Sequence, residues 1–330
     1  MTTLHWGILG AAQIAENRMI PAIKAAKNNT LTAIGSRDLG RAQRLAALGD
    51  GAHAYDSYEA VLADKDVNAV YIPLPNAMHA EWAIKAAEAG KHVLVEKTFA
   101  ANAEEAENVV DACAKAGVTV SESLMYRFHP LTRRILDITR SGMLGKIRSI
   151  NTTFSFTLED PHDIRRNQAL AGGALNDLGT YCVHFARAIA ADEPIEVMAR
   201  GTFGPSGTDE TITGLMRFPN DLTATFTSSF DMPRVSPLIV VGTRGMMYVP
   251  HLFTYFSDNI IRMTLDDKQH RVNTSESIEH IGNTDPYILV LEDFAEAIAT
   301  KRAPKISPDS ILRHQRVLDA LISSARGDCV

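Results

Sequence analysis

Residues 69–97 read AVYIPLPNAMHAEWAIKAAEAGKHVLVEK, and this stretch decides the fold class. Its two ends, residues 69–73 and 92–96, are short apolar runs that predict buried strands. The residues between them predict a helix over about 77–89, which ends at Gly90, a residue favoured at helix C-termini. A strand, a helix and a second strand in this order predict a βαβ unit with parallel strands.

The same alternation of strand and helix runs through the first third of the chain. Further strands are expected at residues 4–9, 31–36, 52–55 and 118–122. Asn102 and Glu105 form a capping box at the start of one helix, and Asp56 is expected to cap another in the same way. Ligands of parallel sheets bind beyond the carboxyl ends of the strands. Because Glu96 and Lys97 stand at such an end, we expect this acid–base pair to face a ligand.

The second part of the chain has a different pattern. From Ile147 onward, runs rich in Thr, Ile, Val and Phe, such as LTATFTSSF at residues 222–230, predict strands with few helices between them. Such runs indicate a mostly antiparallel sheet. Helices are expected at about 131–141, 176–190, 285–300 and 307–325. We therefore expect an α/β protein with two domains, residues 1–123 and 124–330.

Composition and charge restrict the class of protein. The chain has 330 residues, of which 45% are hydrophobic and 22% charged, values ordinary for soluble domains. Its formal charge of −6 gives no reason to expect nucleic acid as a partner. No apolar run reaches the roughly 20 residues of a membrane helix, and a strand expected from Leu4 leaves no room for a signal peptide. Cys113, Cys182 and Cys329 show neither disulfide nor zinc spacing, so we expect a cytoplasmic protein.

The segment GILGAAQIA at residues 7–15 has the position of a dinucleotide-binding fingerprint, after the first strand and at the start of the first helix. Gly10 keeps the first glycine of the G-x-G-x-x-G pattern, while Ala12 and Ala15 replace the second and third. The alternative is an ordinary tight turn between a strand and a helix. In its βαβ context the segment predicts a cofactor pyrophosphate site formed by Gly10, Ala11, Ala12, Gln13 and Ile14.

The end of the second strand bears on the choice between NAD and NADP. An acidic residue here accepts bonds from the ribose 2′-hydroxyl of NAD, whereas arginine pairs with the 2′-phosphate of NADP. Ser36 and Arg37 come first and Arg41 follows one turn later, which favours NADP; Asp38 keeps NAD possible. The alternative is a solvated helix start whose charges bind nothing specific.

Three motifs follow one another along the chain: the fingerprint from Gly7, the Glu96–Lys97 pair and the run GGALNDLGTY at residues 172–181. Together with YIPLPN, MYRFHP and DETITGLMRF, they resemble the Gfo/Idh/MocA oxidoreductases, in the branch of NADP-dependent D-xylose dehydrogenases, dimeric dihydrodiol dehydrogenases and glucose–fructose oxidoreductase. The resemblance extends along the whole chain. It implies an N-terminal Rossmann domain and a C-terminal α+β domain, whose large, open, mostly antiparallel sheet makes oligomer contacts.

Asp177, Tyr181 and His184 are spaced so that they share one face of a helix. The resemblance places Asp177 and Tyr181 at the catalytic positions of the family. Oxidation of a sugar hydroxyl needs loss of a hydride and a proton, and we expect Tyr181 to take the proton while Lys97 bonds the reacting oxygen. Asp177 is expected to orient the sugar, and Glu96 to hold the lysine. The structural alternative makes Tyr181 a packed aromatic and Asp177 an acid at a helix N-terminus.

The resemblance implies further contacts. Cofactor contacts are expected at Pro75, Asn76, His79, Glu96, Lys97 and Arg165, and substrate contacts at Tyr126, Arg127, Asp177 and Tyr181. Thr98 replaces the proline of the family's Glu-Lys-Pro motif, which bears on the placement of Lys97 because proline would restrict the backbone.

A metal site is the other chemical possibility. Its ligands would come from Glu159, His162, Asp163, Asp177 and His184, but no histidine pair among them has the spacing of a zinc protein, so no metal is expected.

The expected function is NADP-dependent hydride transfer to or from a sugar or related polyhydroxy compound, with oxidation of an aldose at C1, as for D-xylose, as the first choice. Open alternatives are a 3-keto sugar reductase, a glycoside hydrolase with bound NAD, and a dinucleotide-sensing regulator without catalysis. The expected partners are a small sugar-like substrate and copies of the same chain, as a homodimer or homotetramer through the C-terminal sheet.

Overall fold

A computed structural model of the chain describes residues 3–253, 259–266 and 274–327. The chain forms two compact units. The first comprises Met1–Met125 and Asp285–Gln315, and the second comprises Tyr126–Thr284 and Arg316–Val330. The chain thus changes units two residues after the expected boundary, and residues 285–315, expected in the second domain, cluster with the first.

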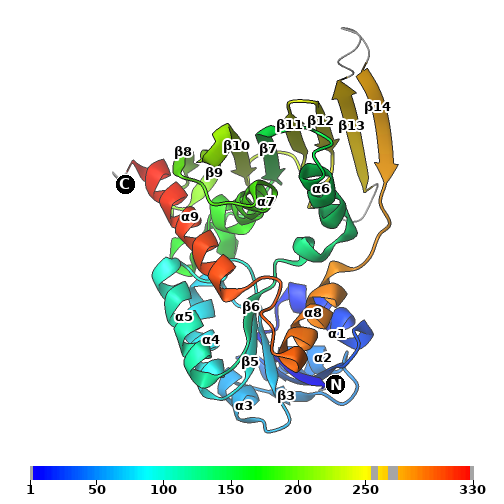
Figure 1. Ribbon diagram of the computed structural model, residues 1–330. Coiled ribbons are helices and arrows are strands. Elements are labelled where there is room, and N and C mark those ends of the chain that lie inside the picture. The colour runs from blue at the N-terminus through cyan, green and yellow to red at the C-terminus, as the bar shows by residue number, and fades with distance from the viewer. Residues whose placement is uncertain (1–2, 254–258, 267–273, 328–330) are drawn as a thin grey trace. The chain divides into compact units, whose positions relative to one another are not determined.

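The first unit is built on a parallel sheet of six strands in the order β3-β2-β1-β4-β5-β6. Figure 1 labels β3, β5 and β6 of this sheet. The strands are β1 (Leu4–Leu9), β2 (Asn29–Gly35), β3 (His53–Tyr55), β4 (Ala69–Ile72), β5 (His92–Val95) and β6 (Val120–Glu122). The helices are α1 (Ile20–Ala25), α2 (Leu39–Ala46), α3 (Tyr58–Ala63), α4 (His79–Glu88), α5 (Ala103–Ala116) and α8 (Pro286–Thr300). A π-helical turn over Ala15–Met19 precedes α1.

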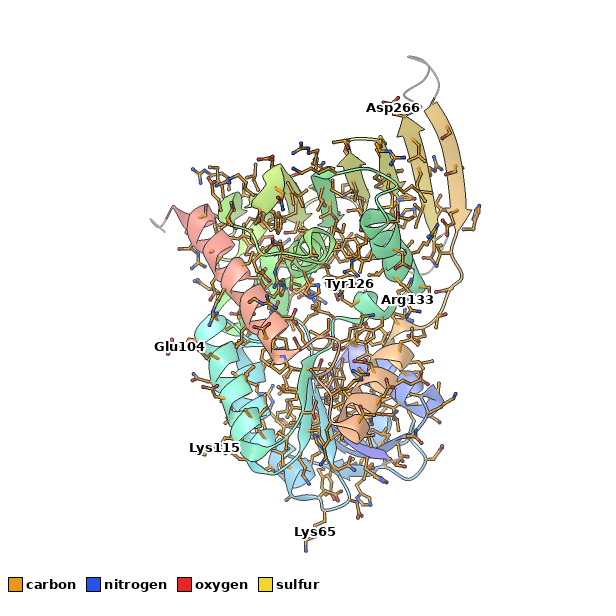
Figure 2. The ribbon with its side chains drawn as sticks, in the orientation of Figure 1. Lys65, Glu104, Lys115, Tyr126, Arg133 and Asp266 are labelled. Atoms are coloured by element: carbon orange, nitrogen blue, oxygen red, sulfur yellow. The ribbon has the colours of Figure 1, made fainter. Side chains whose placement is uncertain are left out.

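The central strands of this sheet lie in its core. All four residues of β4 are buried, as a strand covered on both faces requires. Charged side chains such as Lys65, Glu104 and Lys115 are exposed at the surface (Figure 2). Helix α8 joins this core because the ring of Phe294 packs on that of Trp6 in β1, with centroids 5.7 Å apart.

Two helix starts test the expected caps. Asn102 accepts a hydrogen bond from Glu105 N at 2.9 Å, so the expected capped start of this helix is confirmed. The Glu105 carboxylate accepts from Ala101 N, one residue before the cap, at 3.1 Å. The prediction for Asp56 is wrong. Ser57 is the residue in the extended conformation before α3, and its hydroxyl accepts from Ala60 N at 3.4 Å.

The second unit contains a sheet of eight strands in the order β14-β13-β12-β11-β7-β10-β9-β8. The strands are β7 (Ile147–Ser155), β8 (Glu196–Phe203), β9 (Asp209–Phe218), β10 (Leu222–Ser229), β11 (Leu238–Gly242), β12 (Gly245–Val249), β13 (Ile260–Asp266) and β14 (Thr274–His280). Every neighbouring pair is antiparallel except β7 and β10. The helices are α6 (Pro130–Arg140) and α7 (Thr180–Ala190), and α9 (Pro308–Arg326) contributes its end from Arg316.

Helix α7 packs against β7 and β10, on one face of this sheet. Alternation along β10 explains the arrangement, since Ala224 and Phe226 are buried whereas Thr223, Thr225 and Thr227 are only partly so. The apolar positions of LTATFTSSF therefore face the helix side. The predicted α/β class, with a parallel N-terminal sheet and a mostly antiparallel C-terminal sheet, is confirmed. In the described residues no helix has the length and apolar character needed to cross a membrane.

Candidate active site

The acid–base pair lies where expected, directly after β5. Glu96 is 9% exposed, and its carboxylate accepts hydrogen bonds from the Tyr71 hydroxyl at 2.6 Å and from Lys97 N at 3.2 Å. Burial raises the pKa of Glu96, and the donors from Tyr71 and Lys97 oppose that rise. A carboxylate can stand at the tip of a buried strand because the neighbouring strand β4 supplies a donor for it.

The segment after Lys97 is held from two directions. Phe99 N donates to Glu122 Oε1 at 3.1 Å, and the carbonyl oxygen of Thr98 lies 2.7 Å from His79 Nδ1. The peptide between Lys97 and Thr98 is cis, and Thr98 is fully buried. The second ring nitrogen of His79 lies 2.7 Å from Leu74 O. His79 thus ties the end of β5 to the loop after β4.

Burial affects the protonation of His79. The side chain is fully buried, and burial lowers its pKa to about 4, although both carbonyl oxygens favour its protonation. Burial thus favours the neutral imidazole, which can donate to only one of the two carbonyl oxygens. Pro75 and Asn76, the other expected residues of this loop, are partly exposed.

The fingerprint turn requires a glycine at its first position. Gly10 has φ of +122°, and a Cβ atom there would lie 2.9 Å from Leu74 Cδ2, so only glycine fits. Ala11, Ala12 and Ile14 are partly exposed and Gln13 is exposed. These residues fit a dinucleotide phosphate at the start of the first helix.

The side chains around the end of β2 bear on the choice between the ribose of NAD and the 2′-phosphorylated ribose of NADP. Asp38 caps α2 by accepting a hydrogen bond from Arg41 N at 3.1 Å, which gives its carboxylate a structural role. The Arg41 guanidinium donates to Ala11 O at 2.9 Å and so lies at the fingerprint turn. Arg37 is exposed, and Ser36 is buried and accepts from Asp38 N at 3.2 Å.

The second unit presents Asp177 and Tyr181 from one continuous helical segment. A π-helical turn over Leu175–Gly179 leads directly into α7. Tyr181 is 7% exposed, and its ring packs against Phe154 and Phe253 at centroid distances of 5.5 and 5.3 Å. The packing fixes the ring direction.

Asp177 is bound to Arg165, a residue that was expected to contact the cofactor. It accepts a hydrogen bond from Arg165 Nε at 3.0 Å, and Asp163 accepts from Arg165 Nη1 at 3.1 Å. Burial opposes the charge on Arg165, but the two carboxylates outweigh it and raise its pKa. One guanidinium is therefore held between two carboxylates.

Tyr126 lies inside the second unit. It is fully buried, its hydroxyl lies 2.5 Å from His184 Nδ1, and its ring is 5.7 Å from that of Tyr181. The structure thus brings Tyr126, Tyr181 and His184 into one aromatic cluster. Arg127 is partly exposed.

Other chemistry has less support from these side chains. Among residues 3–253, 259–266 and 274–327, no group of three or more His, Cys, Asp or Glu side chains could hold a metal ion. Burial raises the pKa of the Cys113 and Cys182 thiols to about 12, which is unsuited to a nucleophile. Cys329 lies outside the described residues.

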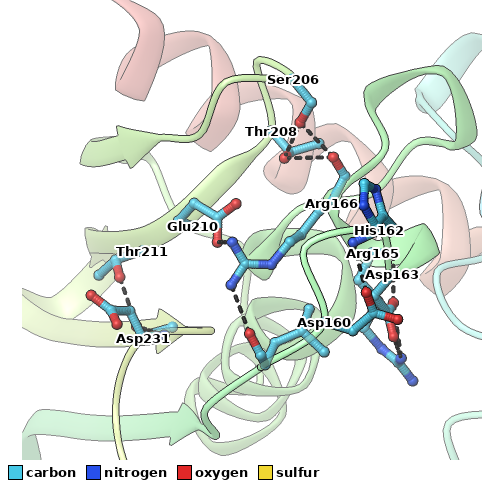
Figure 3. A network of polar contacts seen from close by, with 12 residues as sticks. Asp160, His162, Asp163, Arg165, Arg166, Ser206, Thr208, Glu210, Thr211 and Asp231 are labelled. Carbon is cyan, nitrogen blue, oxygen red and sulfur yellow. Dashed lines mark hydrogen bonds and ion pairs between the residues drawn. The ribbon is translucent and has the colours of Figure 1, made fainter.

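The sequence did not reveal the role of Tyr71 or of a second, larger group of polar residues. Tyr71 was read only as part of an apolar strand, and its hydrogen bond to Glu96 was not expected. The second group, drawn in Figure 3, connects Arg166 to Glu210 by an ion pair of 2.8 Å. The glycines at 172 and 173 mark a close backbone approach beside this group, to Arg165 and Asp209.

Comparison with known proteins identifies the family. Residues 4–124 match the Gfo/Idh/MocA oxidoreductase family with an NAD-binding Rossmann fold, and residues 132–248 match the C-terminal domain of the same family. A D-xylose 1-dehydrogenase (NADP⁺) of Haloferax volcanii is 38% identical over 324 residues, which span 98% of this chain and 97% of that protein. The chain therefore belongs to the Gfo/Idh/MocA oxidoreductases and is a dehydrogenase or reductase, as expected from its motifs.

Two solved structures have the same fold over nearly the whole chain. A 3-ketoreductase from Actinomadura kijaniata, in complex with NADP and TDP-benzene, is 27% identical, with a TM-score of 0.88 and 98% of both chains covered. An aldose–aldose oxidoreductase from Caulobacter crescentus, complexed with glycerol, is 26% identical, with a TM-score of 0.89 and coverage of 99% of this chain and 98% of that chain.

Proposed function

We propose that the protein is an NADP-dependent dehydrogenase that oxidises an aldose such as D-xylose at C1. The observation that carries the choice of substrate is the Arg165 guanidinium held between Asp163 and Asp177. Two carboxylates and one guanidinium leave a negative charge beside Asp177. Sugar hydroxyls can donate to such carboxylates. The Haloferax volcanii relative, a D-xylose 1-dehydrogenase, supports the same choice.

The proposed cofactor is NADP, with NAD as the weaker alternative. Arg41, at the fingerprint turn, and exposed Arg37 would hold the 2′-phosphate, and Asp38 does not compete because it caps α2. Gly10, Ala11, Ala12, Gln13 and Ile14 would bind the pyrophosphate. Pro75, Asn76, His79, Glu96 and Arg165 complete the proposed cofactor contacts. When bound, the nicotinamide supplies the hydride acceptor.

The proposed roles of the reactive side chains follow from their chemistry. Tyr181 takes the proton from the sugar hydroxyl, and Lys97 binds the reacting oxygen and favours its anionic form. Asp177 orients the sugar through its hydroxyl groups. Glu96 positions Lys97 through the backbone bond described above. Tyr126 and Arg127 remain proposed substrate contacts. Tyr126 is buried, and its position supports a role through packing against Tyr181.

The test is a spectrophotometric assay of NADPH formation with a series of aldoses, run in parallel with NAD. Turnover of one aldose with NADP, lost in Lys97→Ala and in Tyr181→Phe, would support the proposal. Unchanged turnover in Tyr181→Phe would exclude its role as the base.

The second candidate is reduction of a 3-keto sugar, which the similarity to the Actinomadura kijaniata 3-ketoreductase favours. NADPH oxidation by a dTDP-linked 3-keto sugar, without aldose oxidation, would identify it. Tightly retained cofactor with no net NADPH formation would instead indicate glycoside hydrolysis with bound NAD. Cofactor binding without any turnover would indicate a dinucleotide-sensing regulator.

We also propose that two copies of the chain associate through the open face of the eight-stranded sheet. One row of paired, non-buried residues crosses all eight strands: Met198, Leu215, Thr225, Asn151, Ile239, Tyr248, Arg262 and Ile278. Met198, Leu215 and Ile278 are 53%, 37% and 59% exposed, so this row presents apolar side chains at both ends of the sheet, and a second copy would cover them.

Light scattering of the purified protein tests this association, with Leu215→Glu as the disrupting variant. A dimer or tetramer that dissociates in the variant would support it, and a wild-type monomer would exclude it. The cytoplasmic location remains a prediction.

A further inference from the structure

Asp209 is a buried carboxylate at the first position of β9. It is 4% exposed, and its Oδ2 atom accepts a hydrogen bond of 2.6 Å from Leu175 N. Leu175 begins the continuous helical segment that carries Asp177 and Tyr181. The first N–H groups of a helix have no partner within the helix, so a buried helix start needs an acceptor from elsewhere. Asp209 is that acceptor for Leu175.

The chain before this helix is shaped around Asp209. Gly173 has φ of +117°, and a Cβ atom there would overlap Asp209 Oδ1. A Cβ atom at Gly172 would overlap the carbonyl oxygen of Arg165, which accepts a hydrogen bond from Gly173 N at 2.8 Å. The two glycines thus allow the backbone to pass between Asp209 and Arg165, whose side chain binds Asp177.

The residues next to Asp209 anchor the same loop (Figure 3). The carboxylate of Glu210 pairs with Arg166 Nη1 at 2.8 Å, and Arg166 Nη2 donates to Leu158 O at 2.8 Å. The hydroxyl groups of Ser206 and Thr208 donate to the carbonyl oxygen of Arg166. The start of β9 therefore holds the 158–173 loop on one side and the helix start on the other.

We propose that Asp209 is a positioning residue, whose carboxylate fixes the first turn of the 175–190 helix and thereby the directions of Asp177 and Tyr181. It acts through Leu175 N and has no contact with substrate in this role. This inference depends on the proposed function in one respect, because it takes Asp177 and Tyr181 to be residues that serve the reaction. The contacts themselves do not depend on which sugar reacts.

The ionisation of Asp209 gives the role a measurable signature. Burial raises its pKa to about 7; the Leu175 N–H bond and Arg326 of α9 oppose the rise, and Glu210 adds to it. Glu210 is in turn paired with Arg166. The charged carboxylate is the stronger acceptor for a helix N-terminus, so the positioning should improve as pH rises through this range.

The experiment compares Asp209→Ala and Asp209→Asn with wild type. In Asp209→Ala we expect kcat to fall by about 10–100-fold while NADP binding is unchanged, because the reacting groups are misplaced. Asp209→Asn keeps an acceptor, so it should retain most of the activity and lose the kcat ionisation near pH 7. Asp192→Ala, at the exposed far end of α7, is the matched control and should behave as wild type.

Hydrogen exchange of a peptide covering residues 173–185 gives a readout that does not depend on activity. Exchange should be faster in Asp209→Ala than in wild type or Asp192→Ala, with Asp209→Asn between them. If Asp209→Ala fails to fold, the Asn variant decides, because a pH profile identical to wild type overturns the role of the charge. A folded Asp209→Ala with unchanged exchange and kcat overturns the proposal. Wild type that oxidises no sugar would overturn the proposed function, while the exchange result would still decide the role of Asp209.

Discussion

The hydroxyl group of Tyr71 donates a hydrogen bond of 2.6 Å to Glu96, from the middle of one strand to the tip of its neighbour. Both side chains are buried in the first unit, so neither can exchange this bond for one with water at low cost. The bond therefore affects the charge state of Glu96 as well as the stability of the fold.

Replacing Tyr71 by phenylalanine tests both effects. The bond lowers the pKa of Glu96 against the effect of burial, so its loss should raise that pKa and move the acid limb of the kcat/KM profile to higher pH. Leaving the buried carboxylate with one donor fewer should reduce the free energy of unfolding by about 1–3 kcal/mol. Tyr58→Phe is the control, since the Tyr58 ring packs edge-on against Trp82 at 4.8 Å in the same unit. Identical pH profiles for Tyr71→Phe and wild type would contradict the prediction.

Arg41→Ala should separate the two dinucleotides. Loss of a guanidinium that pairs with a phosphate should raise KM for NADP by about 10–100-fold and leave KM for NAD unchanged. Arg44→Ala removes a guanidinium from the same helix, where it pairs with Glu16, and should leave the NADP-to-NAD ratio as in wild type. Equal changes with both cofactors would show that Arg41 supports only the turn through Ala11 O.

Arg165→Ala should lower kcat/KM for the sugar by about tenfold or more, because Asp177 loses the charged donor that orients it. The Kd for NADP, measured by fluorescence, decides whether Arg165 also binds the cofactor. Arg217→Ala, which breaks an exposed pair with Glu196, controls for the loss of one positive charge from the same unit. Wild-type kinetics in Arg165→Ala would contradict its role.

Gly10→Ala and Gly90→Ala form a matched pair. Both glycines have positive φ, +122° and +72°, but an added Cβ meets Leu74 at Gly10 and nothing within 4 Å at Gly90. Gly90→Ala should cost about 1 kcal/mol of unfolding free energy from the backbone alone. Gly10→Ala should cost more and also weaken NADP binding. Equal costs by chemical denaturation would mean that Leu74 moves aside freely.

The buried His79 should make the fold sensitive to acid. Its folded-state pKa of about 4 lies below the 6.5 of the unfolded chain, so its contribution to stability is present above pH 6.5 and is lost as pH falls through 4. The loss should amount to about 3 kcal/mol. Denaturant titrations should show this dependence reduced in His79→Gln and retained in His162→Gln, which changes an exposed histidine. Parallel curves for wild type and His79→Gln would contradict the assignment.

Local patterns predicted much of the fold. Alternating strand and helix signals placed the parallel sheet, and the Asn102–Glu105 pair placed a helix start correctly. The Asp56 cap was wrong because Asp56 and Ser57 are adjacent good caps, and the extended backbone that selects Ser57 depends on the strand before it. The membership of residues 285–315 could not be read from the sequence because it depends on packing such as that of Phe294 on Trp6.

The site was predictable only where a motif marks it. Glu96, Lys97, Asp177 and Tyr181 stand in recognisable runs, but Tyr71 and Asp209 act through single hydrogen bonds between distant residues. A tyrosine inside an apolar strand looks like any strand former, and an aspartate at the start of a strand looks like a turn residue. The helical face shared by Asp177 and Tyr181 was expected as an α-helix, whereas the π-helical turn at Leu175–Gly179 depends on the packing around it.

The division of the chain has a consequence for how this protein can be rearranged. The half that holds the fingerprint is encoded in two separate stretches, and Ser121 of β6 donates a hydrogen bond to the carbonyl oxygen of Ile306 in the second stretch. A gene fragment cut after residue 123 would leave Trp6 without Phe294 and Ser121 without its acceptor. Exchange of cofactor modules between such enzymes, in evolution or in the laboratory, must therefore carry both stretches together as a discontinuous cassette.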